Sequence, residues 1–264
     1  MILALKTKKI ISSVELAGTS IRAIEKKAAY TTVYKQDNSP LTEADLESDR
    51  IITEALAKIC PGIPVISEES LRPSENSKIF WLLDPIDGTK EFIAGNGEYC
   101  ISLALIDRGR PVEAYLHAPV SKITWFALKG RGAYRLKNNK AVKLPDKNIK
   151  GNKAFRVLKS RSHHAETESL WFERCSEKHK MESSVQGSAI KFARIAEGSA
   201  DLHIKKGRIF GWDIAAGDLL LSESGGGMAA YPSGSEIVYY PENKIMPEFL
   251  AYGHRVSNPA LFLL

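Results

Sequence analysis

The chain has 264 residues, which is enough for one large domain or for two packed halves with a sizeable core. Its 44% hydrophobic and 26% charged residues are ordinary for a globular protein, and no apolar run approaches the roughly 18 residues of a membrane span. The formal charge of +6 is scattered, without a basic run interleaved with aromatics. This pattern argues against integral membrane contact and against a nucleic-acid partner, and it suits a small anionic substrate.

The cysteines argue against a disulfide framework and against a zinc site. Cys60, Cys100 and Cys175 are odd in number, widely spaced and without a C-x-x-C pair. We therefore expect a reducing compartment and a cytoplasmic protein. A peripheral association with the cytoplasmic face of the inner membrane stays open, and the sequence does not choose between a monomer and a homodimer.

The first half is predicted to begin with two helices and to continue with strands. Apolar residues recur at intervals of three and four between Ile10 and Ile24, which indicates an amphipathic helix within residues 3–29. A second helix is expected from an N-cap at Thr42 to Ile59. Strands are predicted at 63–67, 79–83, 99–106, 111–117, 123–128 and 132–136.

A polar, lysine-rich stretch at 137–153 predicts a boundary near residue 150, which gives an N-terminal α+β half at 1–150 and a C-terminal α/β half at 151–264. In the second half strands and helices alternate, which implies α/β layers. The strands are expected at 155–159, 180–185, 200–204, 237–240 and 249–252, and the helices at 167–177, 189–196 and 214–224.

One stretch of the first half combines a buried strand with two carboxylates and a tight turn. Residues 79–83 form a continuous apolar run, and Asp84 stands where this strand leaves the core. Asp87 follows three residues later, and Gly88-Thr89 lets the backbone turn with free N–H groups. Acids beside exposed amides suit divalent metals and a phosphate, although an Asx-type turn would explain the same residues.

Other polar residues have an ordinary structural interpretation beside a chemical one. Asp45 lies three residues after Thr42, where a capping box wants an acid, and Asp213 stands at a helix start. Glu68 and Glu69 repel each other unless a cation binds, or they are simply solvated. His117 is read as a packed histidine at a strand end. The segment Ser160-Arg161-Ser162-His163 is either a polar loop or a holder for a phosphate or a base.

The combination of acids favours chemistry over capping. Asp45, Glu68, Asp84, Asp87 and Asp213 all fall where an element begins or ends, so their side chains leave the core. Mg²⁺ takes oxygen ligands from a few carboxylates, from water and from substrate phosphate. Such a cluster beside a helix N-terminus predicts metal-assisted hydrolysis of a phosphate ester. No Cys-His or Ser-His-Asp arrangement competes for a covalent mechanism.

Three motifs resemble the signatures of the inositol monophosphatase superfamily of lithium-sensitive, Mg²⁺-dependent phosphatases. They are Glu68-Glu69, Asp84-Pro85-Ile86-Asp87-Gly88-Thr89 and Trp212-Asp213-Ile214-Ala215-Ala216-Gly217, and the segment Ser39-Pro40-Leu41-Thr42-Glu43-Ala44-Asp45 matches the loop before the family's second helix. The order and spacing agree over nearly the whole chain. The resemblance implies a layered αβαβα sandwich of the sugar-phosphatase type.

The same resemblance implies roles for individual residues, with two or three Mg²⁺ ions. The metal ligands would be Glu68, Asp84, Asp87, Asp213 and the carbonyl of Ile86. Thr89, helped by Asp45, would orient the attacking water, and Glu68 would share in the catalytic set. The phosphate would be received by the amides of Gly88 and Thr89 and would lie against Asp213.

Within the superfamily the chain is most similar to the bacterial 3'(2'),5'-bisphosphate nucleotidases. Besides the segments at 39–45 and 160–163, Gly187-Ser188-Ala189-Ile190-Lys191-Phe192 is close to that group's G-S-S-L-K-F. The resemblance implies that His163, Ser188 and Lys191 contact the nucleotide. The implied reaction converts adenosine 3',5'-bisphosphate into AMP and phosphate in sulfur assimilation.

One departure concerns an arginine that this group often carries shortly before the Trp-Asp pair. Here Lys205, Lys206 and Arg208 occupy that region, and the sequence does not say which of them contacts substrate.

Three other functions compete with the nucleotidase. An inositol monophosphatase or another sugar-phosphate phosphatase would use the same acids with a different pocket. A haloacid-dehalogenase-type phosphatase needs two acids two residues apart, whereas Asp84 and Asp87 are three apart. A sensing module or a basic nucleic-acid binder would have lost metal ligands, and none is visibly lost.

Overall fold

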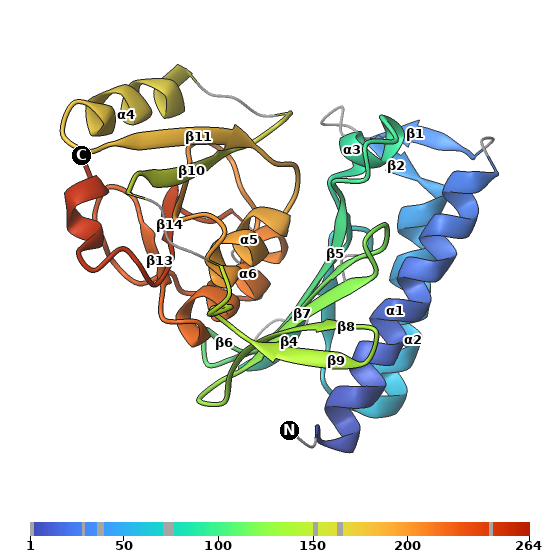
Figure 1. Cartoon of the computed structure of the whole chain (residues 1–264). Coiled ribbons are helices and arrows are strands. Elements are labelled where there is room, and N and C mark those ends of the chain that lie inside the picture. Colours follow the sequence, from blue (N-terminus) through green and yellow to red (C-terminus); the bar gives the residue numbers. More distant parts are fainter. Residues whose placement is uncertain are drawn as a thin grey trace.

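The computed structural model describes residues 3–27, 30–35, 40–70, 77–149, 153–162, 166–242 and 245–264. Five layers alternate across it, as the resemblance predicts (Figure 1). Helices α1 (Leu5–Lys26) and α2 (Glu43–Ile59) cover one face of a large sheet, and α5 (Ile190–Glu197) and α6 (Gly211–Glu223) fill the space between this sheet and a smaller one. Helix α4 (Glu166–Ser176) lies outside the smaller sheet. None of the described helices is both long and apolar enough to cross a bilayer.

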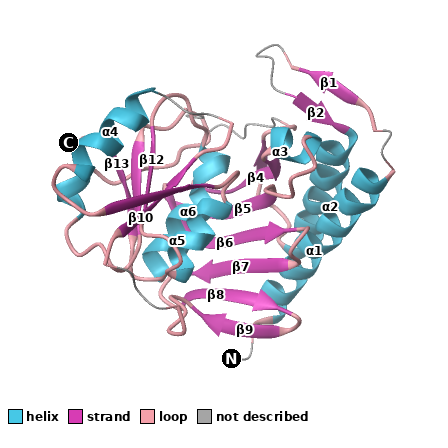
Figure 2. Cartoon of the chain, turned by 45° about the horizontal axis from the view of Figure 1, so that its top comes forward, coloured by secondary structure: helices cyan, strands magenta, loops and turns pink. Residues whose placement is uncertain are grey.

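The large sheet has seven strands and is antiparallel except for its first pair, in which β3 and β4 are parallel. Figure 2 shows its strands from β4 to β9 side by side. Its strands follow the chain order: β3 (Val65–Ser67), β4 (Ile79–Asp87), β5 (Cys100–Asp107), β6 (Arg110–Ala118), β7 (Ile123–Leu128), β8 (Gly132–Lys137) and β9 (Lys140–Lys143). A separate hairpin of β1 (Thr32–Tyr34) and β2 (Pro40–Thr42) precedes α2. The short helix α3 (Thr89–Ile93) follows β4 directly.

The small sheet is mixed and belongs wholly to the second half of the chain. Its spatial order is β11 (Met181–Val185), β10 (Phe155–Lys159), β12 (Leu202–Lys205), β14 (Phe249–Tyr252) and β13 (Gly227–Ala230). Strands β10, β11 and β12 are parallel, and β14 runs antiparallel to both of its neighbours. A short 3-10 helix, η1 (Pro259–Phe262), ends the chain. The boundary predicted near residue 150 falls between the last strand of one sheet and the first strand of the other; as a domain boundary it stays a prediction.

The apolar run in β4 is continuous because both faces of the large sheet are covered. Phe80 and Leu82 pack into the core shared with α5 and α6, whereas Trp81 and Leu83 pack into the core under α1 and α2. The strand is longer than the predicted 79–83, because pairing with β5 resumes at Asp87 after a bulge. Pro85 lies in this bulge, where its missing N–H costs no ladder hydrogen bond.

Several sequence expectations about strands were wrong, and the β1–β2 hairpin was not predicted at all. The edge strand β9 was not predicted, because it is largely solvated and has no apolar alternation. Strand β13 was missed because it begins within a glycine run that was read only as the end of a helix. Residues 237–240 alternate between buried and exposed and were predicted as a strand. They form none, and their backbone is held to the β5–β6 turn through the Tyr239 N–H and the Gly109 carbonyl.

His117 is a packed residue at the end of β6, as predicted. It is 4% exposed, and its Nδ1 lies 2.9 Å from the hydroxyl of Thr124 on β7. Helix α1 passes so close that a Cβ on Gly18 would lie 2.5 Å from the imidazole ring. Burial lowers the pKa of His117 to about 4, so the neutral imidazole is part of the contact between α1 and the large sheet.

Acid is expected to loosen this contact. Because the folded-state pKa lies below the ordinary 6.5, the contribution of His117 to stability is complete above pH 6.5, declines as the pH falls, and is gone below about pH 4. Replacing His117 by glutamine should therefore make the free energy of unfolding less sensitive to pH, by about 2 kcal/mol between pH 8 and pH 5. Urea unfolding at both pH values measures this, and an equal pH sensitivity in both proteins would contradict it.

Candidate active site

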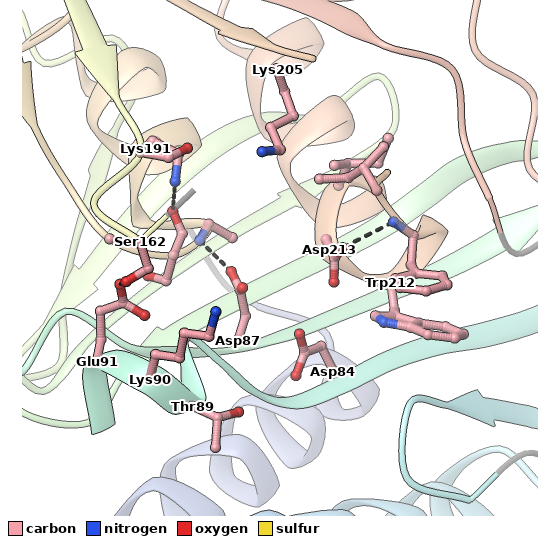
Figure 3. A pocket seen from close by; sticks show the side chains of 18 of the residues that line it. Asp84, Asp87, Thr89, Lys90, Glu91, Ser162, Lys191, Lys205, Trp212 and Asp213 are labelled. Atoms are coloured by element: carbon pink, nitrogen blue, oxygen red, sulfur yellow. Dashed lines mark hydrogen bonds between the residues drawn. The ribbon is translucent and has the colours of Figure 1, made fainter. Parts of the chain in front are cut away.

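A cavity of about 440 Å³ lies where the two halves meet. Most of its lining comes from the end of β4 with α3, from the loop leading into α5, and from the start of α6 with the end of β12. Glu68 and residues 160–162 also line it. In Figure 3, acidic side chains enter from the large-sheet side and from α6, while Lys191 and Lys205 enter from the opposite side. One cavity therefore has an acidic floor and a basic wall.

The bulge in β4 directs the two acids of the strand end. Asp84 is 2% exposed, and its Oδ1 accepts the N–H of Ile86 at 3.0 Å, which closes a tight turn. Helix α2 holds the same turn from behind, because the Ser48 hydroxyl donates to the Pro85 carbonyl at 2.9 Å. The Asx-type turn and a chemical role for Asp84 are therefore compatible.

Three acids from different elements meet in the floor. Carboxylate oxygens of Glu68, Asp84 and Asp213 lie within 4.8 Å of one another. Burial raises the pKa of Asp84 well above its ordinary value, and the charges of Glu68, Asp87 and Asp213 raise it further. In the part of the chain that the structure describes, no ion pair joins Asp84, Asp87 or Asp213 to a lysine or arginine. A cluster of carboxylate oxygens around the buried Asp84 is the kind of donor set that a hard divalent cation requires.

Glu68 differs from the other two acids because it has a cation beside it. The Nζ of Lys35 lies 2.8 Å from a Glu68 oxygen and 2.7 Å from a Glu69 oxygen. Lys35 follows strand β1, so this ion pair ties the β1–β2 hairpin to the end of β3. The positive charge of Lys35 thus offsets the repulsion between Glu68 and Glu69 at one side of the floor.

Asp87 is directed away from this group of three. Its Oδ2 accepts the backbone N–H of Ala189 at the start of α5. Burial raises the pKa of Asp87 to about 6, and the charge of Lys191 opposes the rise. The structure therefore brings Asp87 into the same cavity while linking it to the other half of the molecule.

Asp213 lies inside the first turn of α6, because the helix begins at Gly211. The expectation that Asp213 is itself the N-cap was wrong, because the N-cap is Phe210, three residues earlier. Asp213 Oδ2 accepts the N–H of this N-cap residue at 3.0 Å, as the acid of a capping box does. The preceding carbonyl, that of Trp212, accepts the Ser102 hydroxyl at 2.8 Å. This bond joins the start of α6 to β5 and so helps to fix the position of Asp213 in the acidic floor.

Asp45 combines capping with a contact to Thr89. Its Oδ2 accepts the Thr42 N–H at 2.7 Å and the Thr42 hydroxyl at 2.5 Å, which completes a capping box on α2. Its Oδ1 remains available and lies 3.3 Å from the Thr89 hydroxyl. Burial raises the pKa of Asp45 to about 6. The capping expected from the sequence is confirmed through Oδ2, and the chemical role of Asp45 stays a prediction that the contact of Oδ1 with Thr89 permits.

The basic wall is formed by two lysines. Lys191 is 7% exposed, and its Nζ donates to the carbonyls of Ser188 at 2.8 Å and Gln186 at 3.4 Å. The pKa of Lys191 is lowered by burial, and the charge of Lys205 lowers it further. Lys205 has one acidic neighbour, Glu168, at 3.7 Å.

The structure distinguishes the three basic residues before the Trp-Asp pair. Lys205 and Arg208 line the cavity, whereas the Nζ of Lys206 lies 4.4 Å from the ring centroid of Tyr231 and does not line it. The Arg208 guanidinium lies 4.9 Å from the Phe210 ring, and this ring stacks on Trp212 at 5.0 Å with 12° between the planes.

The remaining predicted residues fall in different places. Gly88 has a φ of +97°, and a Cβ there would approach the Glu98 carbonyl and the Ser188 side chain at 3.2 Å, so glycine is required. Ser188 lines the cavity. His163 lies outside the described residues, as does Ser39 of the segment at 39–45.

Sequence reasoning missed His203 in β12. Its ring is 1% exposed, and its Nδ1 lies 2.9 Å from the Leu158 carbonyl. Burial lowers the pKa of His203 well below its ordinary value, and the charge of Lys191 acts in the same direction. It lines the cavity as a neutral ring beside Phe192 and Phe249. A single histidine within an apolar strand gives no signal that could have identified it.

Comparison with known proteins decides the family. The model of the inositol monophosphatase family matches residues 6–250. The chain belongs to this family. It is also 34% identical to the 3'(2'),5'-bisphosphate nucleotidase CysQ of Salmonella typhimurium over 226 residues, which cover 84% of this chain and 87% of the relative. The corresponding values for CysQ of Escherichia coli K12 are 34%, 228 residues, 85% and 88%.

A solved structure supports the same assignment. CysQ from Bacteroides thetaiotaomicron, a bacterial member of the inositol monophosphatase family, superposes with a TM-score of 0.79 at 29% identity, covering 96% of this chain and 100% of that one. The chain is therefore a Mg²⁺-dependent phosphatase of the inositol monophosphatase family, an enzyme that hydrolyses phosphoric monoesters.

Proposed function

We propose that the enzyme removes the 3'-phosphate of adenosine 3',5'-bisphosphate and releases AMP and phosphate. The observation that carries this proposal is the buried ammonium group of Lys191, which faces the cavity and donates only to backbone carbonyls among the described residues. Burial lowers the pKa of Lys191 although the charges of Asp87 and Glu91 act to raise it, so these acids offset the cost of burying the cation only in part. A second phosphate on the substrate would supply a further anion. The names of the CysQ relatives support the same substrate.

The arrangement of charge suits a substrate with two phosphates. One phosphate would lie over the acidic floor, against Asp213 and the amides of Gly88 and Thr89. The other would lie against Lys191 and Lys205 on the basic wall. A sugar monophosphate would leave both lysines without a phosphate to bind, which disfavours it as the preferred substrate.

The aromatic side of the cavity suits a nucleobase. Phe210 is stacked between the Arg208 guanidinium and the Trp212 ring, so that these three side chains form one column of planar groups. Arginine guanidinium groups stack on bases and carry positive charge toward phosphates. We propose that adenine binds against this column. The contact of His163 with the nucleotide stays a prediction.

Mg²⁺ would be held by oxygen ligands alone, from the carboxylates of Glu68, Asp84, Asp87 and Asp213 and from the Ile86 carbonyl. When bound, the ions neutralise phosphate charge and make water a better nucleophile at neutral pH. The three clustered acids of the floor supply the donors, and the number of ions stays at the predicted two or three.

Thr89 and Asp45 would direct the attacking water. The Thr89 hydroxyl lies 3.3 Å from Asp45 Oδ1 and 3.2 Å from the Ile86 carbonyl, so its one proton has two acceptors within reach. When it donates to Asp45, its lone pairs would accept a hydrogen bond from water. A carboxylate whose pKa is raised to about 6 accepts a proton readily near neutral pH. Water oxygen would attack phosphorus as the bond to the ribose 3'-oxygen breaks, with the water proton passing through Thr89 to Asp45 and a solvent proton completing the 3'-hydroxyl.

Replacing Thr89 by valine should lower kcat by about 10²- to 10³-fold, because a methyl group cannot pass a proton. Serine at the same position should retain most of the activity, since it keeps the hydroxyl. Steady-state rates measure both variants, and Mg²⁺ titration by calorimetry should give unchanged affinity in each. Equal activity of the valine variant and the wild type would exclude this role.

Phosphate release from adenosine 3',5'-bisphosphate and from inositol 1-phosphate, at equal concentrations in Mg²⁺, tests the proposal. We expect kcat/KM to favour the nucleotide. A preference for inositol 1-phosphate would overturn the proposal in favour of an inositol monophosphatase, whose chemistry the same acidic floor would serve.

We place the activity in the cytoplasm, which the three free, buried cysteines support.

A further inference from the structure

The two segments that carry the predicted nucleotide contacts are both tied to the other half of the molecule. Residues 160–162 follow β10, and residues 187–192 lead into α5, so both belong to the small-sheet half. Their partners are Glu91 and Glu98, which follow the phosphate turn Gly88-Thr89 in the large-sheet half. The mechanism above gives neither glutamate a role.

Glu98 binds both segments at once. Its two oxygens each accept a hydrogen bond at 2.8 Å from the guanidinium of Arg161, a bidentate pair, and Oε2 also accepts the Gly187 N–H at 2.7 Å. The pKa of Glu98 is lowered, chiefly by Arg161. Charged bidentate bonds of this kind fix geometry as well as adding energy. We name Glu98, Arg161 and Gly187 the Glu98 clamp.

Glu91 reinforces the clamp from inside. It is 5% exposed, and its Oε1 accepts the Ser162 hydroxyl at 2.5 Å. A Cβ on Gly187 would lie 2.7 Å from Glu91 Cγ and 2.9 Å from the Glu98 carbonyl, so no other residue fits there without moving these groups. The loop into α5 therefore rests directly on the segment that continues from the phosphate turn.

Gly187 of the Glu98 clamp lies a few residues before Lys191 of the basic wall. Ser188 adopts a left-handed conformation with a φ of +56°, and its carbonyl receives the Lys191 Nζ at 2.8 Å. The position of this ammonium thus depends on the backbone at 187–188, which Glu98 and Asp87 hold through the N–H groups of Gly187 and Ala189.

We infer that Glu98 is a positioning residue that sets the distance between the phosphate turn and the basic wall, and so selects esters that carry a second phosphate. This inference rests on the proposed function. Glu98 itself lies outside the cavity lining, so it acts through Gly187 and Arg161. A small monoester, which reaches only the acidic floor, should not sense the clamp.

Glu98→Gln tests this inference, because glutamine keeps the shape but loses the charge and one acceptor. For adenosine 3',5'-bisphosphate we expect KM to rise about tenfold with kcat within twofold, the loss of roughly one charged contact. For glycerol 2-phosphate, which carries one phosphate, kcat/KM should stay within twofold. Equal losses on both esters, or no change on either, would overturn the inference.

A matched control exists on α2. Glu47 accepts two bonds of 2.9 Å from Arg50 in the same bidentate geometry, far from the cavity. Glu47→Gln should leave both substrates unchanged. Arg161→Gln should raise KM as Glu98→Gln does, and the double variant should be less than additive because the two residues share one contact.

A second readout does not depend on the substrate. In Glu98→Ala the Gly187 amide loses its acceptor, so its hydrogen exchange should become at least about tenfold faster than in the wild type. Unchanged exchange would show that Glu98 does not hold the loop and would overturn the inference. If the wild type preferred inositol 1-phosphate, the proposed function would fail, and faster exchange at Gly187 would then show separately that the clamp orders the loop.

Discussion

Replacing Asp84 by asparagine is expected to abolish turnover and, at the same time, to make the metal-free protein more stable. The carboxylate is 2% exposed, and its pKa is raised well above the ordinary value by burial and by the charges of Glu68, Asp87 and Asp213. Asparagine removes one of these like charges and keeps an oxygen that can accept the Ile86 N–H. The substitution should therefore raise the stability of the metal-free fold while it removes a ligand of the metal site.

The two effects have different sizes and are measured separately. Turnover in Mg²⁺ should fall at least about 10³-fold, because several kcal/mol of charge stabilisation in the transition state depends on the ions. The melting temperature in a chelator should rise by about 2 to 4 °C, as a gain near 1 kcal/mol would give in a chain of this size. Asp107→Asn, at the far end of β5, is the control and should change neither quantity.

Retained turnover in Asp84→Asn would show that the floor does not hold the catalytic ions. A lower melting temperature in the absence of metal would contradict the electrostatic argument instead, since it would mean that the Asp84 carboxylate stabilises the fold.

Replacing Lys191 by methionine is expected to remove discrimination between one phosphate and two. The side chain keeps its length and its packing but loses the cation. We expect kcat/KM for adenosine 3',5'-bisphosphate to fall about 100-fold, which corresponds to a charged hydrogen bond of roughly 3 kcal/mol. Adenosine 3'-phosphate, which has no 5'-phosphate, should be hydrolysed as fast as by the wild type.

Lys206→Met is the matched control, because its Nζ lies over the Tyr231 ring and the residue does not line the cavity. It should behave as the wild type on both nucleotides. If Lys191→Met lowered turnover of the monophosphate as strongly as that of the bisphosphate, Lys191 would serve the reaction centre or the fold and would not recognise a second phosphate.

The candidate metal ligands could be predicted because they stand where elements begin or end. Asp84 follows a continuous apolar run, and such a run must be covered on both faces, so its first polar residue leaves the core at a defined place. Asp213 follows from a helix start in the same way. Capping does not exclude the predicted chemical role at Asp45, because a carboxylate has two oxygens and each makes its own contact.

The substrate side was less accessible, because it depends on which side chains face each other across the two halves. The sequence suggested that the segment containing Arg161 could hold a phosphate. In the structure the Nε and Nη2 groups of Arg161 both donate to the carboxylate of Glu98, 63 positions earlier in the chain. Lys205 and Lys206 are adjacent in the sequence, but only Lys205, the last residue of β12, lines the cavity, whereas the Nζ of Lys206 lies over the Tyr231 ring. Neither arrangement can be recognised from the residues that are close in sequence.

The identity of the product tests the account most directly. Adenosine 3',5'-bisphosphate should be incubated with the wild-type enzyme and Mg²⁺, and the nucleotide product identified by chromatography against authentic standards. An acidic floor that takes the 3'-phosphate, with a basic wall that holds the 5'-phosphate, predicts adenosine 5'-monophosphate as the sole first product. Adenosine 3'-monophosphate as the first product would contradict this assignment of floor and wall.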